Sequence, residues 1–186
     1  MQRLLAGALV ALCGTFVCCW QAAAEQPQAQ QREAPEFSEG TTWLNGGPVK
    51  LADLRGRVVV VHFHARGCVN CVRNYPWYQK WHRELGPKGV VLIGIHTPET
   101  EAEKDVDKLR EHLRTHGLEF PVAVDNEGAN WKAWENRLWP CVYLIDKRGI
   151  VRWRWDGEFK YGPYDGDKTL RRKLEQLLRE EGPVVP

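Results

Sequence analysis

The chain has 186 residues and a formal net charge of +2 at pH 7, with 43% hydrophobic and 27% charged residues. This length accommodates one domain with a sizeable core together with a leader segment. The nearly neutral charge gives no electrostatic basis for binding nucleic acid or an anionic membrane surface, and the composition is typical of a soluble globular protein.

The N-terminal segment has the features of an export signal. Arg3 provides a positive start, Leu4 to Trp20 is mainly apolar, and Ala22 to Ala24 are the small residues that a signal peptidase requires. We expect residues 1–24 to form a signal peptide that is cleaved after Ala24, since the apolar stretch is short for a bilayer span. An uncleaved anchor that tethers the protein to the membrane is the alternative. Either way the domain is expected to be exported, to the periplasm or another extracytoplasmic compartment.

The cysteine content changes when this leader is set aside. Three of the six cysteines, Cys13, Cys18 and Cys19, lie within it, and Cys68, Cys71 and Cys141 remain. One pair and one odd cysteine do not make a disulfide-rich scaffold. Outside the cytoplasm, such a pair can cycle or stay oxidised.

The first part of the mature chain is expected to lack regular structure. Residues 25–40 are rich in Gln, Ala and Pro without an apolar period, which predicts a flexible linker before a folded domain over residues 41–186. Thr42–Leu44 and Val49–Leu51 flank Asn45-Gly46-Gly47, which predicts a hairpin. The apolar run Val58–His64 then predicts a buried strand.

A helix is expected from Cys68 to Leu85. Steps of four, three, three and four residues place Cys71, Tyr75, Tyr78, Trp81 and Leu85 on one face. Pro76 lies inside this helix and removes one of its backbone hydrogen bonds.

The rest of the chain alternates between strands and helices. The expected strands are Val90–Ile95, Phe120–Val124, Val142–Ile145 and Ile150–Trp155, and the expected helices are Glu103–Thr115, Asn130–Glu135 and a last helix capped by Asp167. This order of elements predicts an α/β sandwich.

Cys68-Val69-Asn70-Cys71 is the most informative motif, because it lies at the turn from a strand to a helix. Cysteines at this spacing can close a disulfide, and the first lies at the positive end of the helix dipole, which favours its thiolate. A static structural disulfide or half of a zinc site is the alternative, although no second CxxC or HxxxH supplies further zinc ligands. We therefore expect exchange with other disulfides, without a cofactor or a metal.

With these elements in place, the chain resembles the thioredoxin superfamily, in particular exported TlpA-like thiol–disulfide oxidoreductases. It is similar to the branch that contains the C-terminal domain of DipZ-type proteins. The resemblance rests on the strand before Cys68 and Cys71, on Pro76, and on Trp139-Pro140 leading into the next strand. It implies a three-layer sandwich with a central mixed sheet flanked by helices. It also implies an inserted strand and helix, over residues 120–135, before a cis-proline.

The resemblance also implies roles for individual residues. Cys68 matches the attacking cysteine, Cys71 the resolving cysteine, and Pro140 the cis-proline that faces the disulfide. The implied substrate-binding surface comprises Trp139, Pro140, Val69 and Asn70.

Two residues depart from the pattern of the family. His62 occupies the place of the buried acid that helps to move the proton of the resolving cysteine, and Gly67 replaces the usual tryptophan. His62 is therefore a candidate proton carrier, because its reference pKa lies near neutrality. We place His62 and His64 on opposite sides of their strand, where they could not share one ion, and expect each to be a satisfied buried histidine. Cys141 is interpreted as a small buried apolar side chain, with a third exchanging thiol as the alternative.

The function implied is that of an exported thiol–disulfide oxidoreductase that acts on protein disulfides, as a reductase rather than a net oxidase. Its partners would be protein disulfide substrates and a membrane thiol electron donor, with no nucleic acid and at most peripheral membrane contact after signal cleavage. A peroxiredoxin-like thiol peroxidase is one alternative, although Ala65 stands where that active site, Thr-x-x-Cys, has threonine. A copper-binding module that uses Cys68, Cys71 and a histidine is another.

Overall fold

The computed structural model describes residues 28–162 and 165–183, so the expected signal peptide, residues 1–24, lies outside the described residues. The described residues form one seven-stranded mixed sheet with the strand order β1-β7-β6-β3-β4-β5-β2. The strands are β1 (Gln28–Glu33), β2 (Thr42–Leu44), β3 (Val58–His64), β4 (Val90–His96), β5 (Val122–Val124), β6 (Cys141–Ile145) and β7 (Ile150–Asp156). The helices are α1 (Val69–Leu85), α2 (Val106–Thr115), α3 (Ala129–Ala133) and α4 (Gly166–Arg179), and three 3₁₀ turns are η1 (Leu51–Leu54), η2 (Gly86–Lys88) and η3 (Glu101–Lys104).

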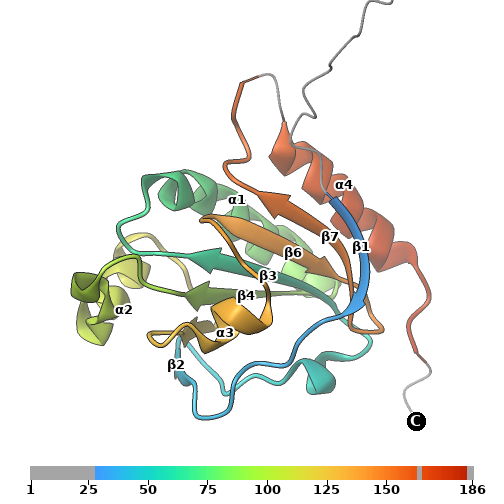
Figure 1. Ribbon diagram of the computed structural model, residues 1–186. Helices are drawn as coiled ribbons and strands as arrows, with labels where there is room; N and C mark the ends of the chain where they lie inside the picture. Colours follow the sequence, from blue (N-terminus) through green and yellow to red (C-terminus); the bar gives the residue numbers. More distant parts are fainter. Residues whose placement is uncertain (1–27, 163–164, 184–186) are drawn as a thin grey trace, which may run out of the picture.

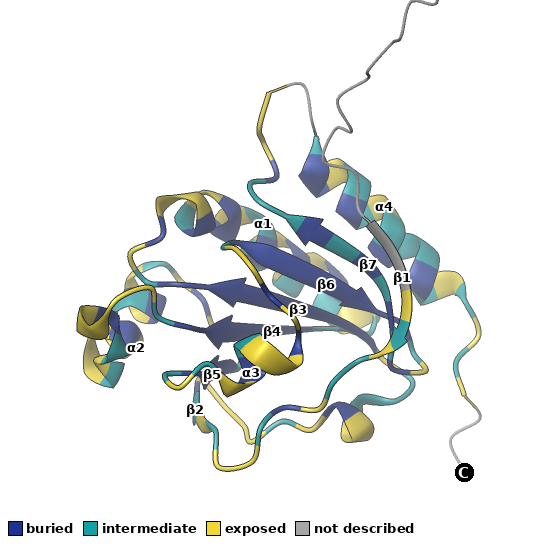
Figure 2. Cartoon of the chain, viewed as in Figure 1, coloured by how far each residue is buried: buried dark blue, intermediate teal, exposed yellow. Residues whose placement is uncertain are grey.

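Helices cover both faces of this sheet. Figure 1 shows α1 and α4 on one side and the short α3 on the other. The central strand β3 is buried along its whole length, runs parallel to β4 and is antiparallel to β6 (Figure 2). The expected α/β sandwich is confirmed, and β5 and α3 stand where the inserted strand and helix were expected.

The two faces of β3 belong to two separate core clusters, because successive side chains of a strand point to opposite faces. Val58 and Val60 pack into the cluster that α1, α2 and α4 cover. Val59, Val61 and Phe63 pack into the cluster on the α3 side. The predicted inward face of α1 is also confirmed, since all five of its residues are at most 2% exposed.

The flexible linker predicted for residues 25–40 is wrong from Gln28 onward. Residues Gln28–Glu33 form an edge strand that pairs antiparallel with β7. The segment that follows is also held in place: Phe37 is buried, and the Glu36 carboxylate accepts hydrogen bonds from the backbone N–H groups of Leu51 and Ala52 at 2.8 and 3.1 Å. An edge strand needs no apolar alternation, because backbone pairing on one side can hold a polar sequence.

The predicted hairpin around Asn45-Gly46-Gly47 is also wrong. Thr42–Leu44 pairs antiparallel with Val122–Val124 of β5 instead of with residues 49–51, which lead into η1. The turn residues do adopt positive φ values, 58° at Asn45 and 130° at Gly46, but the Asn45 amide donates to the Leu118 carbonyl at 2.6 Å. The turn therefore does not close a hairpin, and the chain continues along the surface to η1.

Two helix starts also differ from the prediction. Helix α2 begins at Val106 with Asp105 as its N-cap, whose carboxylate accepts from the N–H groups of Asp107 and Lys108. Helix α4 begins at Gly166 after Asp165, so Asp167 lies in the first turn instead of capping it. The Asp167 carboxylate is buried and forms an ion pair with Lys160 at 2.9 Å.

Candidate active site

Cys68 and Cys71 are joined in a disulfide at the start of α1, with their Cα atoms 5.3 Å apart. Cys68 is the N-cap residue of the helix and is 7% exposed, whereas Cys71 is fully buried. The two residues between them, Val69 and Asn70, are exposed, and Val69 is 62% exposed. Cys68 is therefore the sulfur on the solvent side of the pair.

The first turn of α1 provides a hydrogen bond to the Cys68 sulfur. The backbone N–H of Cys71 donates to Cys68 Sγ at 3.2 Å. The backbone N–H groups at a helix N-terminus have no intrahelical partners, and they carry the positive end of the helix dipole. In the reduced protein this position would stabilise a thiolate on Cys68 more than a thiol.

A buried carboxylate, which the sequence did not indicate, holds the loop that precedes the pair. Glu103 of η3 is 6% exposed, and its two carboxylate oxygens accept the backbone N–H groups of Gly67 at 2.8 Å and Glu99 at 2.9 Å. A Cβ atom at residue 67 would overlap the Glu103 carboxylate. This contact explains why Gly67 stands where the family pattern has a bulky tryptophan.

The Trp139–Pro140 peptide bond is cis, as the resemblance implied. Pro140 directly precedes Cys141, which pairs with Phe63 near the end of β3. Since β6 is antiparallel to β3, Pro140 lies at the edge of the sheet from which the chain continues to Cys68. Beside it, the half-buried rings of Trp131 and Trp139 stack with their centroids 4.1 Å apart.

Cys141 is a free, fully buried thiol. Its side chain belongs to the core cluster on the α3 side, whereas Cys68 and Cys71 belong to the cluster under α1. Burial raises the pKa of the Cys141 thiol well above its usual range. The buried position of Cys141 supports the expected role as a small apolar side chain of the core.

The expectation that His62 and His64 face opposite sides of β3 is wrong, because residues two apart on a strand share a face. Their ring centroids are 5.0 Å apart, beneath α1. Burial lowers the pKa of His62 to about 3 and that of His64 well below its usual value. Neither ring nitrogen of His62 has a hydrogen-bond partner among the described residues, so His62 is not a satisfied histidine.

The ring of His62 fits between α1 and the sheet because its neighbour on β4 lacks a side chain. Gly94 pairs with His62, and a Cβ atom there would lie 3.1 Å from His62 Nε2. The other side of the ring stacks on Tyr78 with a centroid distance of 4.1 Å. His62 therefore lies in a tight aromatic site on the α1 face of the sheet.

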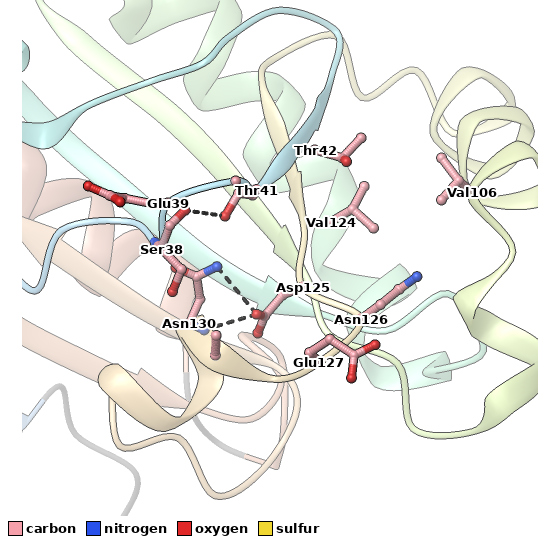
Figure 3. Close-up of a pocket in the computed structure, with 12 residues that line it drawn as sticks. Ser38, Glu39, Thr41, Thr42, Val106, Val124, Asp125, Asn126, Glu127 and Asn130 are labelled. Atoms are coloured by element: carbon pink, nitrogen blue, oxygen red, sulfur yellow. Dashed lines mark hydrogen bonds between the residues drawn. The ribbon is translucent and has the colours of Figure 1, made fainter.

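A pocket of about 240 Å³ lies elsewhere, beside β2 and α3 (Figure 3). Its most buried carboxylate, Asp125, accepts hydrogen bonds from Thr97, Trp131 and the backbone and side-chain nitrogens of Asn130. These bonds fix the turn into α3, and both oxygens of the Asp125 carboxylate are hydrogen-bonded within the protein. This pocket takes no part in the cysteine site.

Among residues 28–162 and 165–183, no group of three or more His, Cys, Asp or Glu side chains is arranged to hold a metal ion. Within the same residues, no helix has the length and apolar character that crossing a membrane requires.

The comparisons with known proteins agree with this geometry. The model of the AhpC/TSA family matches residues 31–154. DipZ of Mycobacterium tuberculosis is 39% identical over 155 residues, which cover 82% of this chain and 21% of DipZ. The thiol–disulfide oxidoreductase YkuV of Bacillus subtilis is 27% identical over 146 residues, which cover 78% of this chain and 94% of YkuV.

Among solved structures, the thioredoxin-like superfamily protein SPOA0173 superposes with a TM-score of 0.71 at 30% identity, covering 82% of this chain and 99% of that protein. The fold and the paired cysteines define a thioredoxin-like oxidoreductase. The chain belongs to the AhpC/TSA family. It spans about a fifth of the length of the DipZ proteins that it matches.

Proposed function

We propose that this chain exchanges disulfides with protein substrates through Cys68 and Cys71, outside the cytoplasm, and acts mainly as a reductase. The observation that carries the proposal is the position of the pair: Cys68 caps α1 on the solvent side, and Cys71 lies fully buried behind it. Disulfide exchange needs an attacking sulfur that a substrate can reach and a second sulfur close enough to attack the mixed disulfide.

The reaction takes two steps. The Cys68 thiolate attacks one sulfur of a substrate disulfide, a Cys68–substrate bond forms, and the other substrate sulfur leaves as a thiolate. Cys71 then loses its proton and attacks Cys68 Sγ. The intramolecular disulfide forms, and the electron pair of the mixed disulfide leaves on the second substrate sulfur. Two electrons have moved from the protein to the substrate.

The helix start makes the first step effective near neutral pH. Lowering a thiol pKa from about 8.5 to about 7 raises the thiolate share at pH 7 from about 3% to about 50%. This change corresponds to about 2 kcal/mol, which a helix terminus together with the Cys71 N–H hydrogen bond can supply. The gain in rate is smaller than the gain in thiolate, because nucleophilicity falls with pKa.

Substrate chains would bind across the surface around Cys68. Exposed Val69 and Asn70, on one side, and Trp139 with cis-Pro140, on the other, would hold an extended segment. Leu138, 39% exposed, adds to the apolar part of this surface. Such a surface suits unfolded protein chains, which offer both backbone and apolar side chains.

The surroundings of Cys68 support the proposed direction of electron flow. Val69 and Asn70 supply no cation, and the Glu103 carboxylate lies at the adjacent Gly67 amide. A nearby negative charge opposes the thiolate and so favours the disulfide, which makes the dithiol a better reductant. Continued reduction outside the cytoplasm would require electrons from a membrane thiol donor.

The test is to trap the mixed disulfide. In Cys71→Ser, the first step proceeds and the second cannot, so substrates should remain attached to Cys68 and be released by dithiothreitol. Cys68→Ser is the matched control and should trap nothing. Absence of any trapped protein, together with rapid consumption of peroxide by the wild type, would favour the peroxidase alternative instead.

A further inference from the structure

Five of the six histidines of the chain lie close together beneath α1 and beside α2. Ring centroids are 5.0 Å apart for His62 and His64, 5.5 Å for His64 and His96, and 4.2 Å for His112 and His116. A protein of this size has no packing reason to gather imidazoles in its core, because they bring polar nitrogens that need partners.

A tyrosine connects the two parts of this cluster by hydrogen bonds. The Tyr75 hydroxyl lies 3.0 Å from His64 Nδ1 and 3.2 Å from His112 Nε2. Because a hydroxyl donates one hydrogen bond and accepts another, it can link the two rings in series. His64–Tyr75–His112 is therefore a continuous hydrogen-bonded chain across β3, α1 and α2.

One end of this hydrogen-bonded chain is fully buried, and the other end is partly exposed on α2. Tyr75 lies one helical turn after Cys71 on the same buried face of α1, where side chains four residues apart are neighbours. His64 is fully buried, whereas His112 is only half-buried and lies beside His116. At the inner end, His64 Nε2 and both nitrogens of His62 have no partner among the described residues.

We propose that His64, Tyr75 and His112 form a proton relay that carries the proton of Cys71 to solvent during the resolving step. The proposal rests on the proposed function. As Cys71 attacks Cys68, His64 Nε2, which has no other partner among the described residues, takes up the Cys71 proton. The proton on His64 Nδ1 passes to the Tyr75 oxygen, the Tyr75 hydroxyl proton passes to His112 Nε2, and His112 Nδ1 releases one proton to solvent. The departing substrate thiolate takes up a proton from solvent, so charge and atoms balance.

A relay explains the site better than one buried base does. Burial lowers the pKa of His62 to about 3 and that of His96 to about 4, so a proton that remained on these rings would be strongly unfavourable. A neutral imidazole can accept a proton at one nitrogen while it donates from the other. Burial also raises the pKa of the Tyr75 hydroxyl well above its usual range, which keeps it protonated and able to serve as a link.

Several titratable groups act on the residues of the relay. They are His62 on β3, His96 on β4, His116 on α2, and Arg66 and Glu103 in the two loops. Burial is the main cause of the lowered pKa of His96 and His112, and a neighbouring histidine and then Arg66 lower the pKa of each ring further. A proton that reaches His112, whose pKa is lowered to about 4, therefore passes quickly to solvent.

The experiment compares Tyr75→Phe with Tyr78→Phe in the full chain. Both variants remove one buried hydroxyl from the same face of α1, but only Tyr75 bridges two histidines. Stopped-flow mixing of the reduced protein with a disulfide substrate separates formation of the mixed disulfide from its resolution. In Tyr75→Phe we expect unchanged formation, resolution slowed by about a hundredfold, and a smaller solvent deuterium isotope effect. Tyr78→Phe should resolve as the wild type does.

A second variant tests whether the more exposed His112 is the outlet, that is, the residue that releases the proton to solvent. His112→Gln should slow resolution, and added imidazole should restore it, because small bases can reach a half-buried site. His82→Gln, which changes the one histidine outside the cluster, should behave as the wild type does. A merely structural role would give no imidazole rescue.

The outcomes separate the two proposals. A wild type that forms no mixed disulfide overturns the proposed function and the relay with it. An active wild type in which Tyr75→Phe and Tyr78→Phe resolve equally fast overturns the relay alone. Failure of imidazole to restore His112→Gln would likewise contradict the outlet.

Discussion

Replacement of Gly67 by alanine should destabilise the protein only while Glu103 is present. The backbone of Gly67 does not have a positive φ, so alanine fits the local conformation. The obstacle is the Glu103 carboxylate, which a Cβ atom at residue 67 would overlap. Glu103 cannot simply turn away, because it is buried and accepts two backbone N–H hydrogen bonds.

The magnitude follows from those bonds. A hydrogen bond to a charged group contributes about 1.5–3 kcal/mol, and the new Cβ displaces at least the bond to Gly67. We therefore expect Gly67→Ala to cost about 2 kcal/mol. In a Glu103→Ala background the space is free, and the same change should be neutral or slightly stabilising, because alanine restricts the unfolded chain more than glycine does. The coupling energy between the two sites should be about 2 kcal/mol.

The assay is a double-mutant cycle of urea unfolding, with all four proteins in the oxidised state. Comparable m-values would show that the four transitions report the same two states. If the costs of Gly67→Ala and Glu103→Ala add without coupling, Glu103 does not determine the need for glycine at position 67, and the explanation of the missing tryptophan fails.

Three further predictions concern acid, the free thiol and the leader. Burial lowers the pKa of His62 to about 3 and of His96 to about 4, while an unfolded histidine titrates near 6.5. The unfolded state thus takes up protons first, so stability is complete above pH 6.5 and falls below it, by about 2 kcal/mol for each such histidine at pH 5. Urea unfolding at pH 7 and 5 should show this loss, and equal stabilities would contradict it. Cys141→Ala should leave disulfide exchange unchanged, and iodoacetamide should label Cys141 only after unfolding; labelling in the native state would refute its burial. N-terminal sequencing of protein exported by its own host should begin at Glu25, whereas an intact Met1 would indicate the uncleaved anchor.

The parts of the fold that the sequence predicts correctly are those that local periodicity controls. Helix α1 buries one face, and its steps of three and four residues reveal that face directly. The central strand β3 is buried on both sides, so its continuous apolar run is equally clear.

The errors arise where a partner far away in the chain decides the outcome. Thr42–Leu44 could have paired with residues 49–51, but its partner is β5, about eighty residues later. Likewise, β1 is polar and gains its structure from backbone pairing with β7. No local pattern carries this information.

In the site, too, the local features were predictable from the sequence and the contacts between distant segments were not. The spacing of Cys68 and Cys71 and the neighbouring helix were sufficient to predict the disulfide pair, which is local. The contact between Glu103 and Gly67 joins two loops that follow different strands, and the Tyr75–His112 hydrogen bond joins two helices. Only the folded chain brings these residues together, although Gly67 itself was a sign that something else filled the space.

Insulin turnover tests the central claim most directly, because each cycle requires the Cys68–Cys71 bond to open and close. With dithiothreitol as the electron source, the wild-type protein should accelerate precipitation of the reduced insulin B chain, and neither Cys68→Ser nor Cys71→Ser should sustain that turnover. A wild type no faster than dithiothreitol alone, with its disulfide still intact, would contradict the account.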